Sequence, residues 1–392
     1  MSYCSFMERY FKNYLRLIHL IEIFLLLLHE NIVLLWNYVS LITPKCNMLD
    51  IKYTLEELCS ISSPSGYEMN ITSFLRSYLS RYDNIIVTED SIGNIIVKKN
   101  GSSNRDIMLV AHCDEIGFAV KYIDESGYIH FSPLGGIDPT ILRGRDVVIM
   151  HRGVPICGVI GARPVSLSKN NKSKDIDISD LWIDIGVSSK SEALNSVSVG
   201  DPITFKPHYN ELCNNIFSTK SIDNRVGVAI LMTLIDRLHD VDTVGNMHFV
   251  FSVQEEVGLR GVTTAGYNIH PNIGIAIDVT HATDYPTINK NAFGEIKIGG
   301  GPSIPVGPNF SSLVQNKLRD IAAQNNIAYQ VESISGFSGT DVAELQLLRG
   351  GCQSGLLSIP CRYMHTPIEA ASYDDVLSAI EILFEFCTAK NI

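Results

Sequence analysis

Residues 222–238 (IDNRVGVAILMTLIDRL), 247–253 (MHFVFSV) and 273–277 (IGIAI) decide the fold class of this chain. The first stretch repeats apolar residues at helical spacing, and the other two are apolar runs of the length of buried strands. A similar run, IMLVA, lies earlier, at residues 107–111. Helices that alternate with buried strands predict an α/β sandwich with a largely parallel sheet.

Further elements of the same kind are predicted on both sides of these stretches. Helical spacing predicts helices over residues 53–61, 69–82, 314–325, 342–348 and 374–387. A strand pair is predicted over residues 85–87 and 94–98, around the turn Ser91-Ile92-Gly93. The alternation of helices and strands therefore extends over most of the chain from residue 48 onward.

The region between about residues 117 and 207 has a different character. Glycines separate short apolar strands, and helical patterns are nearly absent. The strands are predicted over residues 118–122, 128–131, 147–150, 158–160, 181–185 and 202–205. We therefore expect a small β-barrel or sandwich, residues 117–207, inserted into an α/β domain formed by residues 48–116 and 208–392.

Composition narrows the functional class. A chain of 392 residues is long enough for a large core and more than one domain. The formal net charge is −11, without a long basic run, which argues against nucleic acid as the main partner. The nine cysteines contain no Cys-x-x-Cys pair and are odd in number. This predicts reduced thiols and a cytoplasmic protein rather than a disulfide framework.

Residues 1–47 stand apart from the rest. Residues 17–35 are strongly apolar, but Glu22 and Glu30 interrupt them, and charge inside a membrane span is costly. No small residues stand where a signal peptide would be cleaved. We therefore predict an extension outside the fold, which begins at about Met48. A membrane anchor is the weaker interpretation.

Histidines and carboxylates follow or adjoin the apolar runs in five short stretches. These are AHCDE at 111–115, SIDN at 221–224, QEEVG at 254–258, AID at 276–278 and MHTP at 364–367. A pair of divalent cations needs such a set, with nitrogen and oxygen ligands, one carboxylate to bridge and one free to handle a proton.

Structural roles compete with metal binding at the first two stretches. His112 and Asp114 are two residues apart at a strand end, so they face the same way. Asp114 then suits the carboxylate that orients a ligating histidine, unless the pair is simply a polar strand end. Asp223 precedes a helix, where it serves either as an N-cap or as a carboxylate shared by two metals.

Glu255 and Glu256 directly follow the strand at 247–253, at the edge where open α/β sheets place their active sites. Extended backbone points the two side chains apart, so one can bind metal while the other holds a water. The competing interpretation is a solvated turn before Gly258.

Two further ligands are predicted later in the chain. Asp278 ends the strand at 273–277 and is preferred over His281, which is placed in a loop. His365 follows the apolar residues 356–361 and is a candidate second nitrogen ligand. Alone, Asp278 is a strand terminator and His365 a structural loop histidine. Their interpretation as metal ligands is favoured only because they belong to the set.

The ordered set resembles the M42 family of metallo-aminopeptidases, which includes the glutamyl, leucyl and lysyl aminopeptidases of tetrahedral particles. The resemblance runs from about Met48 to the C-terminus. The motifs that carry it are His-x-Asp at 112–114, SIDNR at 221–225, QEEVGLRG at 254–261, Asp278 and RYMHTP at 362–367. The stretches SSPSG at 62–66, GGGP at 299–302 and SGTD at 338–341 are also similar to the family pattern.

The resemblance implies a zinc-peptidase-like fold and a role for each residue. His112 and Asp278 would bind one metal, Glu256 and His365 the other, and Asp223 would bridge them. Asp114 would orient His112, and Glu255 would be the general base. The inserted β-rich domain would mediate dimerisation, with dimers assembling into a hollow dodecamer.

The predicted function is therefore removal of N-terminal residues from peptides by metal-activated water, with two divalent ions per subunit. Zinc and cobalt both fit the ligand set. One rival is a glycoside hydrolase using Glu255 and Glu256, which leaves His112, His365 and Asp223 unexplained. The other is a non-catalytic assembly protein, which would be expected to have lost a ligand.

Overall fold

The computed structural model describes residues 49–164 and 176–389. The extension predicted over residues 1–47 lies outside the described residues. Within the described ranges, no helix is long and apolar enough to cross a membrane.

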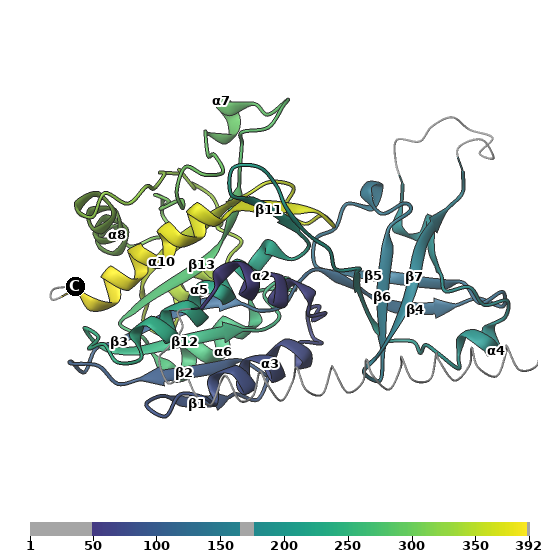
Figure 1. Cartoon of the computed structure of the whole chain (residues 1–392), viewed down its shortest axis with the longest axis horizontal. Helices are drawn as coiled ribbons and strands as arrows, with labels where there is room; N and C mark the ends of the chain where they lie inside the picture. Colours follow the sequence, from purple (N-terminus) through teal and green to yellow (C-terminus); the bar gives the residue numbers. More distant parts are fainter. Residues whose placement is uncertain (1–48, 165–175, 390–392) are drawn as a thin grey trace, which may run out of the picture. The chain divides into compact units, whose positions relative to one another are not determined.

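A mixed sheet forms the centre of the α/β part (Figure 1). In the described part of the chain it has six strands, in the order β1 (Ile86–Glu89), β2 (Ile95–Lys99), β12 (Asn246–Ser252), β3 (Asp106–His112), β13 (Ile273–His281) and β14 (Gln353–Cys361). The last four strands run parallel to one another, whereas β1 and β2 pair antiparallel. The mixed α/β class predicted from the sequence is confirmed.

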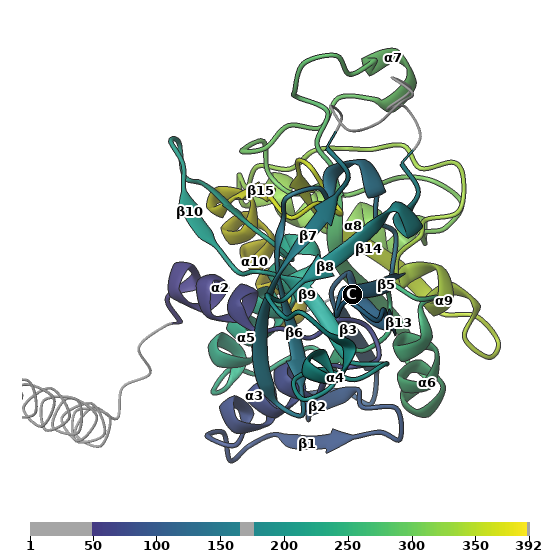
Figure 2. The ribbon, with the colours of Figure 1, turned by 90° about the vertical axis from the view of Figure 1, so that its right-hand side faces the viewer.

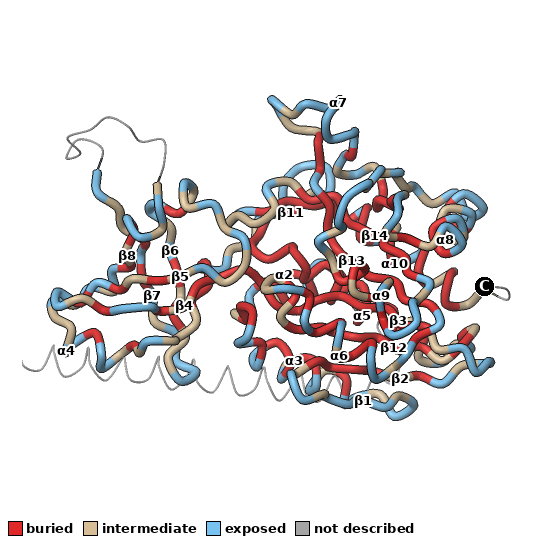
Figure 3. The backbone as a smooth tube through the Cα atoms, turned by 180° about the vertical axis from the view of Figure 1, so that it is seen from behind, coloured by how far each residue is buried: buried red, intermediate tan, exposed pale blue. Residues whose placement is uncertain are grey.

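Helices pack on both faces of this sheet because its central strands are apolar on both sides. In β3, Ile107 and Leu109 pack in a cluster with helix α5 (Ile222–Leu238). Met108 and Val110 pack in a second cluster with helices α6 (Arg260–Ile269) and α9 (Val342–Leu347). The helices are α2 (Ile51–Ser60), α3 (Met69–Leu79), α5 (Ile222–Leu238), α6 (Arg260–Ile269), α8 (Ser312–Gln324), α9 (Val342–Leu347) and α10 (Tyr373–Thr388). Figure 3 shows β3, β12, β13, β14 and α5 as largely buried segments.

The β-rich region forms a closed barrel rather than a sandwich (Figures 1 and 2). Its strands are β4 (Gly117–Ile123), β5 (Ile129–Leu134), β6 (Asp146–His151), β7 (Val154–Ala162), β8 (Leu181–Asp184) and β9 (Pro202–Phe205). Every pairing in it is antiparallel. Its core is separate from those of the α/β part, with Phe118, Phe131 and Phe205 packed edge to face.

Some elements were not predicted. The sequence of α6 contains Gly261 and Gly266, which disfavour a helix. Gly261 has no room for a side chain, because a Cβ there would lie 2.4 Å from the carbonyl oxygen of Val253. A small sheet of β10 (Tyr209–Glu211), β11 (Ile216–Thr219) and β15 (Glu369–Ser372) and the one-turn helices α4 (Lys190–Ala193) and α7 (Lys290–Phe293) were also missed.

The placement of His281 in a loop and of Asp278 at a strand end was wrong. Both residues lie in β13, with His281 its exposed last residue. The strand is longer than its apolar run because β14 pairs with it as far as His281. By contrast, β3 pairs with β13 only as far as Ala276. Asp278 therefore lies just beyond the point where β13 loses its pairing with β3.

Candidate active site

The carboxyl ends of parallel strands bring most of the predicted site residues together. His112 is the last residue of β3, and Asp114 follows two positions later. Glu255 and Glu256 lie in the loop after β12, and Asp278 lies within β13, two residues beyond the last pairing with β3. His365 and Asp223 join them from outside the sheet. His365 comes from the loop between β14 and β15, and Asp223 from the start of α5.

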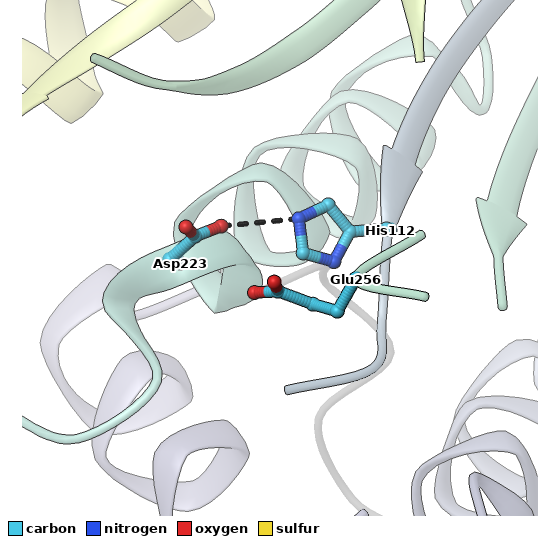
Figure 4. A group of neighbouring side chains, drawn as sticks. All are labelled: His112, Asp223 and Glu256. Atoms are coloured by element: carbon cyan, nitrogen blue, oxygen red, sulfur yellow. Dashed lines mark hydrogen bonds and ion pairs between the residues drawn. The ribbon is translucent and has the colours of Figure 1, made fainter. Parts of the chain in front are cut away.

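Asp223 lies between the two histidines. Its Oδ1 is 3.0 Å from His112 Nε2, and its Oδ2 is 3.3 Å from His365 Nε2. Figure 4 shows the carboxylate of Asp223 pointing at the ring of His112, with the side chain of Glu256 beside them. Each oxygen of one carboxylate thus faces a different imidazole.

The remaining carboxylates divide between the two histidines. Near His112 Nε2 lie Asp278 Oδ1 at 3.8 Å and Glu255 Oε2 at 3.9 Å. Near His365 Nε2 lies Glu256 Oε2 at 3.4 Å. Two groups have ligand atoms that all lie within 4.8 Å of one another: His112, Asp223 and Glu256, and His112, Glu255 and Asp278.

Asp114 lies behind His112, with Oδ1 3.4 Å from the ring nitrogen Nδ1. It also accepts hydrogen bonds from the backbone N–H groups of Glu255 (3.1 Å) and Glu256 (3.2 Å). The hydroxyl of Ser65 donates to its other oxygen at 2.6 Å. Asp114 therefore ties the end of β3 to the loop that carries the two glutamates.

Asp223 does not cap its helix, because its neighbour does. Asn224 Oδ1 accepts the backbone N–H of Gly227 at 3.1 Å, which is the hydrogen bond of an N-cap. Asp223 and Asn224 both have non-helical backbone angles, so regular helix begins at Arg225. The side chain of Asp223 therefore faces the two histidines instead of capping the helix.

The cluster places several carboxylates close together in a buried site. Burial raises the pKa of Glu255 and of Asp278 well above their usual values. Burial alone would lower the pKa of His365, but Asp223 and Glu256 raise it to about 11. Glu256 Oε1 is buried without a hydrogen-bond partner among the described residues. Crowded carboxylates and imidazole nitrogens in a buried site are suitable ligands for divalent metal ions.

Four further buried carboxylates surround the cluster and were not predicted: Glu68, Glu115, Asp341 and Glu369. Glu68 accepts the backbone N–H groups of Gly66 (2.7 Å) and Gln254 (3.0 Å), and burial raises its pKa to about 7. Asp341 accepts the hydroxyl of Ser252 at 2.6 Å. Their positions gave some signal, since each lies within a motif or within two residues of one.

Glu115 forms an ion-pair network with residues on either side of Asp223 in the sequence. Its Oε2 accepts Lys220 Nζ at 2.6 Å and the hydroxyl of Ser221, and its Oε1 accepts the backbone N–H of Ser63 at 2.9 Å. Arg225 Nη2 lies 3.5 Å from Oε1. Burial would raise the pKa of Glu115, but Lys220 and Arg225 hold it below its usual value.

The histidines and carboxylates of the candidate site thus lie together at the carboxyl edge of a mixed α/β sheet. The comparisons with known proteins identify the family. The M42 glutamyl aminopeptidase model matches residues 93–382, so the chain belongs to that family.

Similar proteins carry related descriptions. A putative aminopeptidase of Acetivibrio thermocellus is 37% identical over 84% of this chain and 96% of its own length. The lysyl aminopeptidase of Pyrococcus furiosus is 34% identical over 75% of this chain and 84% of its own. A solved structure of the TET1 peptidase of Pyrococcus horikoshii superimposes with a TM-score of 0.78 at 32% identity, covering 87% of this chain and all of its own. The protein is therefore a peptide-hydrolysing enzyme.

Proposed function

We propose that the protein is an aminopeptidase that uses two divalent metal ions. His112 and Asp278 would hold one ion, His365 and Glu256 the other, and Asp223 would be shared. The observation that carries the proposal is the position of Asp223, whose two oxygens face different imidazoles at 3.0 and 3.3 Å. A shared carboxylate of this kind is what two neighbouring cations require.

The two ions would polarise the scissile carbonyl and stabilise the negative charge that develops on its oxygen. Glu255 is the carboxylate left without a metal in this assignment, and it acts as the general base. It takes a proton from the attacking water and later gives that proton to the leaving amine. Burial raises the pKa of this carboxyl group well above its usual value, so its carboxylate is a stronger base than that of an exposed glutamate.

The substrates are peptides with a free N-terminus, since acidic side chains near the reacting bond favour a substrate ammonium group. The donor set fits zinc and cobalt equally. The glycoside-hydrolase alternative uses only Glu255 and Glu256 and leaves both histidines unexplained. A non-catalytic assembly protein gives no reason for the complete set of side chains in the cluster.

The barrel is proposed as the dimerisation domain of residues 117–207, inserted into an α/β/α sandwich of the zinc-peptidase type formed by residues 48–116 and 208–392. The TET1 peptidase of Pyrococcus horikoshii can assemble into a tetrahedron or a large octahedral shell, which supports a closed homo-oligomer here. The cytoplasmic location predicted from the cysteines belongs to the same proposal.

The test is hydrolysis of a panel of amino-acyl chromogenic substrates, with and without a chelator, beside a glucan assay. We expect release of the chromophore that stops with chelator and returns with zinc or cobalt. Turnover that survives complete removal of metal would refute the metal-dependent mechanism. Cleavage of glucan but not of amino-acyl substrates would favour the glycoside hydrolase.

A further inference from the structure

One buried carboxylate outside the proposed ligand set joins two of the ligand residues. Glu369 is 1% exposed. Its Oε2 accepts the backbone N–H of Asp223 at 3.0 Å, and its Oε1 accepts the backbone N–H of His365 at 2.8 Å. Asp223 and His365 are far apart in the sequence, so this side chain links two separate segments.

The backbone of Glu369 is itself held in place. Glu369 opens β15, which pairs antiparallel with β11 and sets Glu369 opposite Thr219. The next residue, Ala370, exchanges two backbone hydrogen bonds with Arg362 (2.9 and 3.1 Å). The carboxylate therefore extends from a fixed point toward the two N–H groups.

The two halves of the proposed metal centre are supported differently. His112 and Asp278 lie in β3 and β13 and are held by strand pairing. His365 lies outside helices and strands and has a positive φ of 59°. Its ring is fixed by Nδ1, 2.8 Å from the carbonyl oxygen of Gly136, and its backbone by Glu369. The His365 half thus depends on side-chain support.

We propose that Glu369 is a positioning residue that sets the relation between Asp223 and His365, and so builds the binding site of one of the two ions. The inference rests on the proposed two-metal function. It predicts that loss of this carboxylate weakens the ion at His365 and Glu256 more than the ion at His112 and Asp278. Residues that support metal ligands typically change metal affinity by about 10–100-fold.

The test is metal titration of the full-length Glu369→Gln variant. Glutamine matches the size of glutamate, but its amide nitrogen cannot accept an N–H, so one of the two hydrogen bonds is lost. Calorimetric titration of zinc into metal-free protein should show two ions in the wild type. In the variant, one ion should keep its affinity and the other should weaken about 10-fold or more. Hydrolysis by the variant should recover when zinc is raised, whereas the wild type should not respond.

Asp375 provides a matched control. Its buried carboxylate also accepts two backbone N–H groups, from Gly299 and Gly301 at 2.7 Å each, but touches no proposed ligand. Asp375→Asn loses the same kind of hydrogen bond and should bind both ions as the wild type does. An equal change in both variants would show a general effect of the fold and overturn the proposal.

The other outcomes also decide the question. Glu369→Gln that binds both ions with unchanged affinity, or loses both equally, overturns the positioning role. If this variant does not fold, Glu369→Asp replaces it, because it keeps the charge and shortens the reach by one methylene. Failure of both to fold assigns Glu369 to the fold alone. Wild-type protein that binds fewer than two ions refutes the proposed function instead.

Discussion

At the scale of the residue, Asn224 and Asp223 have different roles, one as a helix cap and the other as a candidate metal ligand. The sequence does not tell these roles apart. Asn224 caps α5 through Gly227, and its Nδ2 donates to the carbonyl oxygen of Ile277 at 2.8 Å. Asp223 is therefore free to face both histidines. A cap and a metal ligand call for the same residue type, so only their side-chain directions separate the two roles.

Glu255→Gln should keep the fold and the bound metal but lose most of the turnover. The amide cannot take the proton of the attacking water, and general base catalysis typically contributes about 10²–10⁴-fold. The measurement is the rate of amino-acyl substrate hydrolysis beside metal analysis of the same sample. A metal-loaded variant that works at the wild-type rate would show that another residue is the base.

Asp223→Ala is the contrasting variant, since it removes the carboxylate whose two oxygens face the two imidazoles. It should lose bound metal as well as activity. Full metal occupancy in this variant would contradict the bridging role.

At the scale of the element, the junction between β11 and α5 depends on Glu115. Lys220 and Ser221 follow β11 directly, and both side chains bond to Glu115. Ser221 has a left-handed backbone, with φ 61°. The network thus holds the turn that delivers Asp223 to the site.

Glu115→Gln should lower the stability of the fold by about 3–5 kcal/mol, because it leaves the ammonium group of Lys220 buried without its counter-charge. Thermal unfolding of the metal-free protein measures the effect. A matched control is Glu211→Gln, which breaks the exposed pair with Lys52 (3.0 Å) and should cost only about 0–1 kcal/mol. Equal losses in the two variants would show that the buried network has no special weight.

The stability gap between the wild type and Glu115→Gln should depend on pH. The pKa of Glu115 is lower in the folded protein than its ordinary value of 4.5. Its contribution is therefore fully present above pH 4.5 and disappears as the pH falls through the lowered folded value. Unfolding measured from pH 7 downward should show a constant gap that narrows below about pH 4. A gap that widens in acid would refute the assignment.

At the scale of the whole molecule, the barrel has its own core, and residues 135–136 of the β-rich region lie against the candidate site. The carbonyl oxygen of Gly136 accepts from His365 Nδ1, and a Cβ on Gly135 would lie 3.3 Å from Glu256 Oε2. The barrel contributes none of the proposed ligands, so a domain of this size has room for another task. We propose subunit contact as that task.

We expect the metal-loaded protein to form a dodecamer, and dimers when metal is removed. A closed assembly would admit peptides and exclude folded proteins, which suits a peptidase that trims short products. Light scattering coupled to gel filtration measures the mass in both states. An active, metal-loaded protein that stays monomeric at micromolar concentration would refute the assembly while leaving the catalytic proposal intact.

A chain that begins at Met48 should fold and hydrolyse amino-acyl substrates like the full-length chain. The described helices and strands begin with α2 at Ile51, and every proposed ligand lies after it. Expression, membrane fractionation and activity of the two forms test this. Loss of folding in the shorter form would show that residues 1–47 belong to the fold.

The mixed α/β class and the set of candidate ligands were both predicted from the sequence. Buried strands and helices leave strong apolar patterns in a sequence. The motifs around His112, Asp223 and His365 can be recognised by their residue types and spacing before the fold is known. The sequence did not predict the exact ends of β13 or the presence of α6. Pairing with β14 extends β13 beyond its apolar run. In α6, close packing of Gly261 against Val253 outweighs the weak helix propensity of the sequence.

Only the tertiary structure decided how the site is supported. Each oxygen of Asp223 faces a different histidine, Glu115 meets Lys220, and Glu369 joins Asp223 to His365. These contacts connect segments that are distant in the chain and leave no local pattern, because an isolated carboxylate has the same form whether it is solvated, caps a helix or holds a ligand. Packing brings the partners together, and burial then makes each unpaired charge or N–H costly enough to fix their arrangement.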